Sequence, residues 1–364
     1  MGVRRRWVWR VAPLVGFAVA VGLVVAGPAP SGLAAMLAVL GLVVLTAAVF
    51  SSVHHADIIA HRLGEPYGTL VLTVAVTVIE LALILSIMLA GEGQPALARE
   101  TVFSVIMVVC NGVVGLCLIV GGLRYGEQGF RLPGANAYLV VLMPLASLAL
   151  LLPTYTTSTP GPFYTPVQLG FVSLVTLMLY GVFLYVQTVR HRDYFLSDTG
   201  DVPDESDGGG GPTARQFWES VGLLLVALAG VVLLAKSFAV AIESAVQAVG
   251  APIEAVGLLV ALLVLLPETL AALRAARRNE LQKSLNLALG SSLATIGLTI
   301  PAVSALALVL RQPLELGIDM HDTVLLVLTF AVSLVTFGGG RTNILPGFVH
   351  LVLFVTFVFL IFVP

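Results

Sequence analysis

Charged residues are scarce in this chain. They make up 10% of its 364 residues, whereas soluble domains carry about 25%. Hydrophobic residues account for 58%, enough for about ten membrane crossings of about 20 residues each. The formal net charge of -2 provides no basic excess for nucleic acid. These deficits exclude a soluble domain and a nucleic-acid partner, and they predict an all-α polytopic membrane protein embedded in a lipid bilayer.

Cysteine is almost absent as well. Cys110 and Cys117 are the two in the sequence, and seven residues of helix separate them by about 10 Å, which is too far for a disulfide. We expect both to be small packing residues rather than ligands.

Eleven apolar stretches lie between clusters of Gly, Pro and charge, and each is read as a transmembrane helix. The arginines before the first stretch also fit a signal peptide, but a retained first helix explains them more simply. The predicted spans are 11–27, 33–60, 67–90, 98–123, 136–152, 166–189, 217–247, 251–273, 280–309, 323–337 and 345–362.

The distribution of basic residues tests this number of spans, because one missed helix would invert every later loop. With the N-terminus inside, only Arg99 and Arg311 of the 18 basic residues fall outside, and Lys236 lies within a span. The pattern predicts a membrane protein with a cytoplasmic N-terminus and an extracytoplasmic C-terminus.

An acidic, glycine-rich stretch at 190–216 reads as a cytoplasmic linker. It divides the last ten helices into five and five, and an odd number per half forces the halves to insert with opposite topology. The predicted organisation is an N-terminal helix and loop (1–32), a first five-helix repeat (33–189), the linker and a second five-helix repeat (217–364). This is a transporter architecture.

Glu80 interrupts an otherwise uncharged run, and an unpaired carboxylate there would cost several kcal/mol. Thr69, Thr73 and Thr77 share its helix face, so their oxygens form a stripe across the membrane. The alternative for each threonine is a hydrogen bond to its own helix carbonyls. That alternative does not account for the glutamate.

Glu268 is the corresponding acid of the second half. Pro267 precedes it and frees the carbonyl of Leu263, which leaves backbone oxygen at membrane depth. Because the two glutamates lie in antiparallel helices of opposite repeats, we expect them to meet near the midplane as paired ion ligands. A structural pair that shares a proton is the alternative.

Amide and hydroxyl oxygens downstream complete a predicted ligand shell. Asn286, Gly290 and Ser291 lie together on one helix, and Asn111 holds the equivalent place in the first half. Six to eight hard oxygens with two carboxylates suit Ca²⁺ or Na⁺. Zinc and copper do not fit, since no histidine or cysteine lies nearby at ligand spacing. The predicted metal ligands are Glu80, Glu268, Thr77, Asn111, Ser291 and Asn286.

Proton exchange follows from the same two acids. Desolvation and like-charge repulsion both favour protonation when the pair is empty, so protons compete with the metal. The cation or protons neutralise the site. The empty site, with both carboxylates charged, moves poorly from one side of the membrane to the other. No cofactor is expected beyond the transported ions.

Two pairs of segments resemble the two repeats of the calcium:cation antiporter superfamily. The first pair is Leu63-Gly64-Glu65-Pro66-Tyr67-Gly68-Thr69 with Val78-Ile79-Glu80, and the second is Leu266-Pro267-Glu268-Thr269 with Leu289-Gly290-Ser291-Ser292. The chain is most similar to bacterial calcium/proton exchangers of the ChaA type, through His54-His55-Ala56-Asp57, the acidic linker and Gly340-Arg341-Thr342-Asn343. The resemblance implies a bacterial inner (cell) membrane protein that extrudes a cytoplasmic cation, Ca²⁺, Na⁺ or K⁺, in exchange for protons. It assigns ion binding to Glu80 and Glu268 and departs from the superfamily at Cys110-Asn111-Gly112.

Three further points stay open from the sequence alone. His54, Asp57 and His61 share a face near the cytoplasmic end of the second span and form either a proton-entry cluster or a hydrogen-bonded cap.

The rival functions are a Na⁺/H⁺ or K⁺/H⁺ antiporter with the same site, a passive channel and an intramembrane protease. The protease lacks an HExxH motif, a Ser/His pair or paired aspartates within the spans, so the expected protein is not an enzyme. Assembly into a homodimer or larger homo-oligomer stays open, although no sequence signal indicates it.

Overall fold

The computed structural model describes residues 3–26, 31–64, 67–90, 95–196, 212–248, 250–252 and 254–363. The chain divides into two compact units, which we describe in turn. Unit 1 comprises Met1–Gln94 and Glu205–Ile253, and unit 2 comprises Pro95–Asp204 and Glu254–Pro364. Most of the predicted linker, residues 197–211, lies outside the described residues.

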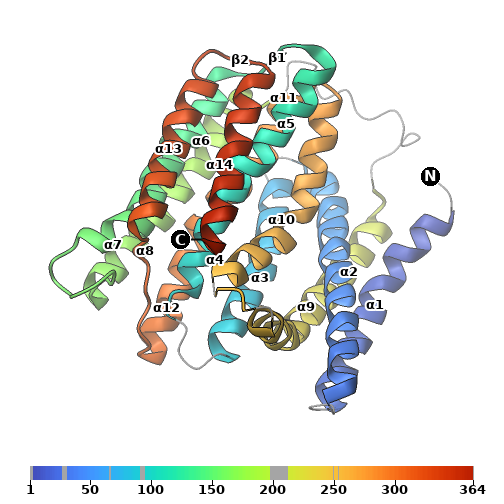
Figure 1. Cartoon of the computed structure of the whole chain (residues 1–364). Coiled ribbons are helices and arrows are strands. Elements are labelled where there is room, and N and C mark those ends of the chain that lie inside the picture. Colours follow the sequence, from blue (N-terminus) through green and yellow to red (C-terminus); the bar gives the residue numbers. More distant parts are fainter. Residues whose placement is uncertain are drawn as a thin grey trace. The chain divides into compact units, whose positions relative to one another are not determined.

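Eleven helical segments run through the described residues, one for each predicted span (Figure 1). Several begin or end a few residues beyond the prediction, because polar first and last turns continue the helix past its apolar part. Unit 1 contains α1 (Val3–Ala26), α2 (Ser31–Leu63), α3 (Tyr67–Ala90) and α9 (Ala214–Ala248).

Unit 2 contains the other seven segments, several of them interrupted by π turns. They are α4 (Leu97–Met107), η1 (Val108–Val113) and α5 (Val114–Tyr125); α6 (Leu132–Ala146), η2 (Ser147–Leu151) and α7 (Leu152–Tyr155); α8 (Pro166–Tyr185) and η3 (Val186–Arg190); α10 (Glu254–Arg277); α11 (Leu281–Ala294), η5 (Thr295–Thr299) and α12 (Ile300–Leu310); α13 (Met320–Phe337); and α14 (Ile344–Phe362). The 3₁₀ turn η4 (Arg192–Tyr194) and the strands β1 (Gln128–Gly129) and β2 (Arg341–Thr342) lie in connections.

Length and hydropathy support membrane insertion. Within the described residues, nine helices are long and apolar enough to cross a bilayer. The shorter apolar stretches Trp9–Leu23 and Val71–Ser86 belong to α1 and α3. The chain is therefore an all-α, integral membrane protein, as its composition predicts.

In unit 1, α9 packs along α1, α2 and α3. Ala56, Ile59, Ala75 and Leu224 form a buried core between α2, α3 and α9. The contact of α1 with α2 and α9 makes the first helix part of this unit.

In unit 2, the spans that contain α4 and α11 each change to a π turn near their midpoint, at η1 and η5. A π turn inserts one extra residue and redirects the side chains that follow, and such turns are frequent at functional sites. The repeat and the inversion of its two halves stay predictions.

Local signals explain several helix ends in unit 2. Thr165 caps α8 through a reciprocal pair of hydrogen bonds with Gln168, and Pro166 occupies the first helical position. Gly126 ends α5 with a φ of 76°, which glycine adopts without strain. The Asn343 side chain caps α14 by accepting from the Leu345 amide.

The connections of unit 2 gather into two opposite groups. At one end β1 pairs with β2 (Figure 1), and the Tyr125 hydroxyl donates to the Arg277 carbonyl at 2.9 Å. At the other end, the Glu315 amide donates to the Pro95 carbonyl.

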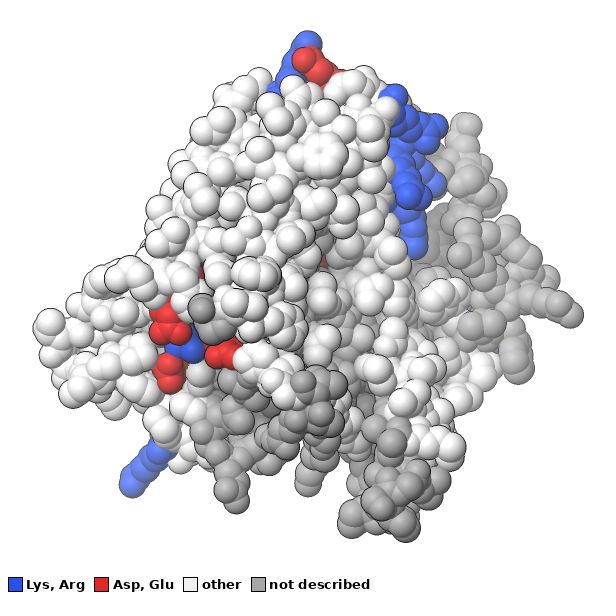
Figure 2. Space-filling view, viewed as in Figure 1, with Lys and Arg blue, Asp and Glu red and all other residues white. Residues whose placement is uncertain are grey.

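Charge separates between these ends. The connections at the β1–β2 end carry many basic side chains, while Arg99 and Arg311 belong to the other end. Figure 2 shows a broad uncharged surface with Lys and Arg gathered at the β1–β2 end. Such segregation is what the positive-inside rule requires.

Candidate cation site

Glu268 on α10 lies at a small pocket inside unit 2. Both of its carboxylate oxygens are buried and have no hydrogen-bond partner among the described residues. The pocket is lined by Val109 and Val113 of η1, Leu265, Glu268 and Thr269 of α10, and Ala288 and Ser291 of α11. A buried carboxylate without a partner is costly, so this site calls for a proton or a cation.

Close helix packing holds this pocket together. Gly257 brings α10 against the backbone of α4, since an added Cβ would lie 2.7 Å from the carbonyl carbon of Glu100. Pro267 has no amide hydrogen, so the carbonyl of Leu263 lacks its usual helical donor. Backbone oxygen is therefore available in the same helix as the carboxylate.

Two hydroxyl residues share the pocket with Glu268. Ser291 was predicted from the sequence, and the structure brings it to the same pocket. Thr269 was not among the predicted ligands, although it directly follows Glu268. Its hydroxyl donates to the Leu265 carbonyl at 2.7 Å, which leaves its oxygen lone pairs available to a cation.

Asn111 does not line this pocket. Its side-chain nitrogen donates to the Thr329 hydroxyl at 2.8 Å, and its side-chain oxygen lies 3.0 Å from Nδ1 of His350. All three side chains are completely buried. The structure therefore gives Asn111 partners on α13 and α14, and it does not bring Asn111 together with Glu268.

Asn286 is also separate from the pocket. It donates to the Phe195 carbonyl at 2.6 Å and accepts from the Gln282 side chain at 2.8 Å. Phe195 packs edge-on against the ring of Tyr138. In this structure, Asn286 anchors the described first part of the predicted linker.

Glu80 and Thr77 lie on α3 in unit 1. Glu80 is almost fully buried, and Thr77 is also buried. The Thr77 hydroxyl donates to the Thr73 carbonyl at 2.9 Å, which is the back-bonding alternative for that residue. The Thr69 side chain lies outside the described part. Because Glu80 and Glu268 belong to different units, their meeting stays a prediction.

His54, Asp57 and His61, the three residues near the end of α2, take part in two kinds of contact. Asp57 and His61 form an exposed pair across one helical turn, with 3.4 Å between Oδ1 and Nδ1, whereas the ring of His54 stacks on Trp9. The buried histidine is His55, which the sequence interpretation left aside. Its Nε2 lies 3.0 Å from the Trp9 carbonyl oxygen.

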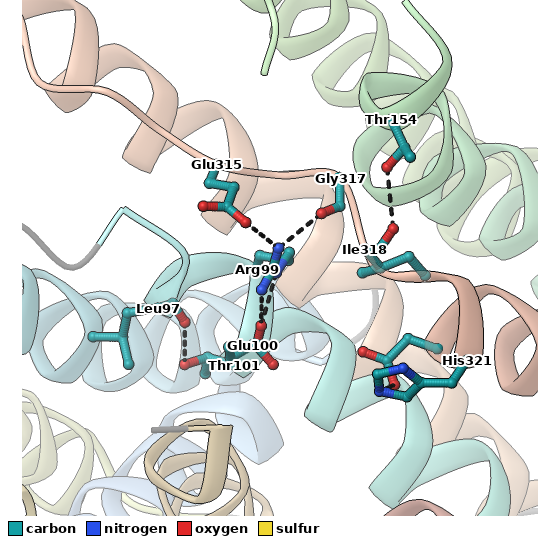
Figure 3. Close-up of polar contacts among 10 residues, drawn as sticks. Leu97, Arg99, Glu100, Thr101, Thr154, Glu315, Gly317, Ile318 and His321 are labelled. Carbon is teal, nitrogen blue, oxygen red and sulfur yellow. Dashed lines mark hydrogen bonds and ion pairs between the residues drawn. The ribbon is translucent and has the colours of Figure 1, made fainter. Parts of the chain in front are cut away.

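Sequence reasoning also missed a buried ion cluster at the end of unit 2 opposite β1 and β2 (Figure 3). Arg99 donates to Glu100 through Nε at 2.7 Å, to the carboxylate of Glu315, and to the Gly317 carbonyl at 2.9 Å. Its side chain is only 8% exposed. The sequence placed Arg99 on the outer side, at the start of the span 98–123, and its neighbour Glu100 was the sole available signal.

Comparisons with known proteins identify the class. The profile of the sodium/calcium exchanger protein family matches residues 33–189 and 219–363. The chain belongs to this family and thus to the calcium:cation antiporter superfamily, which confirms the resemblance seen in the sequence.

Two curated relatives cover most of the chain. One is y4hA of Sinorhizobium fredii, a provisionally named ionic transporter, which is 44% identical over 98% of this chain and 96% of its own. The other is the sodium-potassium/proton antiporter ChaA of Escherichia coli, which is 38% identical over 89% of this chain and 88% of its own. Both are named as transporters rather than enzymes.

Solved structures support the fold. The structure of native YfkE gives a TM-score of 0.73 at 18% identity and covers 98% of this chain and 100% of that one. The H⁺/Ca²⁺ exchanger CAX gives a TM-score of 0.68 at 17% identity, covering 98% and 89%.

Proposed function

We propose that this protein is a secondary active cation/proton antiporter that extrudes Ca²⁺ from the cytoplasm by alternating access. The observation that carries the proposal is the Glu268 carboxylate, whose two buried oxygens have no hydrogen-bond partner in the described structure. Such a group is stable in the membrane only when neutralised. A proton and a cation both neutralise it, and they exclude one another, which is the requirement for exchange.

The chemistry around Glu268 favours a hard cation. The hydroxyls of Ser291 and Thr269 line the same pocket, and the free carbonyl of Leu263 lies one turn before Glu268. Oxygen ligands of this kind suit Ca²⁺, which takes six to eight of them, and also Na⁺. Glu80 of the first repeat supplies the second carboxylate in this proposal, with Thr77 beside it. Asn111 and Asn286 then serve as ligands only in a state where they leave their present partners.

A second candidate is Na⁺/H⁺ or K⁺/H⁺ exchange at the same site. The 38% identity to the sodium-potassium/proton antiporter ChaA favours this candidate, while YfkE and CAX, the structural neighbours, are named for Ca²⁺. The oxygen ligands alone fit both kinds of cation.

The proposed location is the bacterial cell membrane, with the N-terminus in the cytoplasm and the C-terminus outside. Support comes from the basic side chains gathered at the β1–β2 end of unit 2. In this orientation the Arg99 cluster faces the outside.

The test is flux into proteoliposomes with an imposed pH gradient, with Ca²⁺, Na⁺ and K⁺ offered in turn. We expect Ca²⁺ movement against protons, and we expect Glu268→Gln and Glu80→Gln each to abolish it. Glu127→Gln is the matched control, because Glu127 is exposed in the connection before β1, and it should transport normally. Normal transport by Glu268→Gln would refute the site. Movement of Na⁺ or K⁺ without Ca²⁺ would select the second candidate, and flux indifferent to the proton gradient would indicate a channel.

A further inference from the structure

A buried hydrogen-bond network lies inside unit 2, outside the Glu268 pocket. His350 of α14 joins Asn111 of η1 through Nδ1 at 3.0 Å and Thr336 of α13 through Nε2 at 3.1 Å. Asn111 continues the network to Thr329, also on α13, at 2.8 Å. His350, Asn111 and Thr329 are completely buried.

The partners determine which atoms donate. The Asn111 nitrogen donates to Thr329, so the Asn111 oxygen faces the histidine and accepts from Nδ1. Nε2 of the neutral ring then accepts from the Thr336 hydroxyl. Each polar atom of the ring has one partner, and the Nδ1 hydrogen bond is the one that reaches η1.

Asn111 sits directly behind the wall of the Glu268 pocket. Val109 and Val113 of η1 line that pocket, and Asn111 is two residues from each. On a helical turn, residues four apart share a face and a residue midway between them points the other way. The side chain of Asn111 therefore holds η1 from the back, while its two neighbours form the surface before the carboxylate.

Helix packing alone does not require this histidine. Gly115 and Gly347 already bring α5 and α14 into close contact, since an added Cβ on Gly115 would lie 3.0 Å from the Gly347 carbonyl oxygen. Placing an ionisable ring at membrane depth is costly and marks function more often than packing. A π turn is also less regular than an α-helix, so its position depends on side-chain contacts such as this one.

We propose that His350 is a positioning residue of the cation site: through its Nδ1 hydrogen bond to Asn111, it fixes the π turn whose Val109 and Val113 form the wall before Glu268. This inference rests on the proposed function, because it concerns the geometry of that site. Loss of this hydrogen bond lets the wall shift. The shift weakens cation binding more than it lowers the maximal transport rate.

Two substitutions separate this role from simple packing. An asparagine amide overlays Nδ1 of histidine, so His350→Asn keeps the donor to Asn111 and loses the contact with Thr336. A glutamine amide overlays Nε2, so His350→Gln does the opposite. Both lose the ring, and a role in packing alone would make them equally defective.

The assay is proton-driven cation uptake into proteoliposomes as a function of cation concentration. We expect His350→Gln to raise the half-saturating concentration about fivefold, the worth of one buried hydrogen bond, with the maximal rate within about twofold of wild type. His350→Asn and Thr336→Val should stay near the wild-type value. Thr356→Val, which alters an exposed threonine bonded to its own helix on α14, is the control for substitutions in that helix.

Equal half-saturation for His350→Asn and His350→Gln, whether normal or raised, would overturn the inference and leave the proposed function intact. A loss confined to the maximal rate would overturn it too. A wild-type chain that moves no cation against protons would refute the proposed function, and the inference with it.

Discussion

Replacing Arg99 with methionine should destabilise unit 2 strongly. Arg99 holds two carboxylates and one carbonyl, and the side chains of Arg99, Glu100 and Glu315 are only 8%, 6% and 22% exposed. Removing one partner of a buried ion pair costs about 3–5 kcal/mol, because the remaining charge stays buried without compensation. Since Glu315 is partly exposed, we expect the lower value, about 3 kcal/mol.

The matched comparison is Arg10→Met. Arg10 pairs with Glu219 at 2.6 Å, but these side chains are 55% and 31% exposed, and such surface pairs contribute about 0.5 kcal/mol. The difference of about 2.5 kcal/mol corresponds to about 60-fold in the unfolding equilibrium. Arg99→Lys should fall between them, because a single ammonium cannot reproduce the geometry of the guanidinium.

The measurement is SDS-induced unfolding of the purified protein in mixed micelles, followed by the loss of helical circular dichroism. A triple variant, Arg99→Met with Glu100→Gln and Glu315→Gln, should recover part of the loss, because the two carboxylates that Arg99 contacts are then uncharged. If Arg99→Met unfolds no more easily than Arg10→Met, or if the triple variant is no more stable than the single one, the reasoning about a buried cluster is refuted.

Two further predictions concern unit 2. Gly257→Ala should lose about 1–3 kcal/mol of stability and impair transport, because the added Cβ would overlap the α4 backbone. The control is Gly170→Ala, whose Cβ would meet nothing within 4 Å and which should be neutral in the same unfolding assay. Equal stability of the two variants would contradict the close crossing of α10 and α4. Tyr164→Phe should cost about 1 kcal/mol, because the hydroxyl donates to the Leu148 carbonyl at 2.6 Å, with the exposed Tyr155→Phe as control. Burial raises the pKa of Tyr164. The stability that its neutral hydroxyl contributes should therefore be present below about pH 10, the ordinary tyrosine pKa, and be lost as the pH rises above it. A free energy of unfolding that does not change with pH in this range would contradict the buried hydroxyl.

The helices of this protein could be predicted from sequence because the signals are local. A bilayer requires long apolar helices, and Gly, Pro and charge mark their ends, so all eleven spans appear at the predicted places. Glu268 with Ser291 could be predicted for the same reason: an acid in an apolar run, and a hydroxyl on the next helix, stand out without tertiary information.

Only the tertiary structure decided what the other polar residues contact. Asn111 resembled a ligand from its position, yet its partners, Thr329 and His350, lie 218 and 239 residues away in sequence. Arg99 was predicted at the outer end of a span, and only the structure shows its contacts with Glu315 and Gly317. Hydropathy and helical periodicity act over a few residues, whereas a hydrogen bond depends on which helices cross and where, and the packing of glycines such as Gly115, Gly257 and Gly347 determines those crossings.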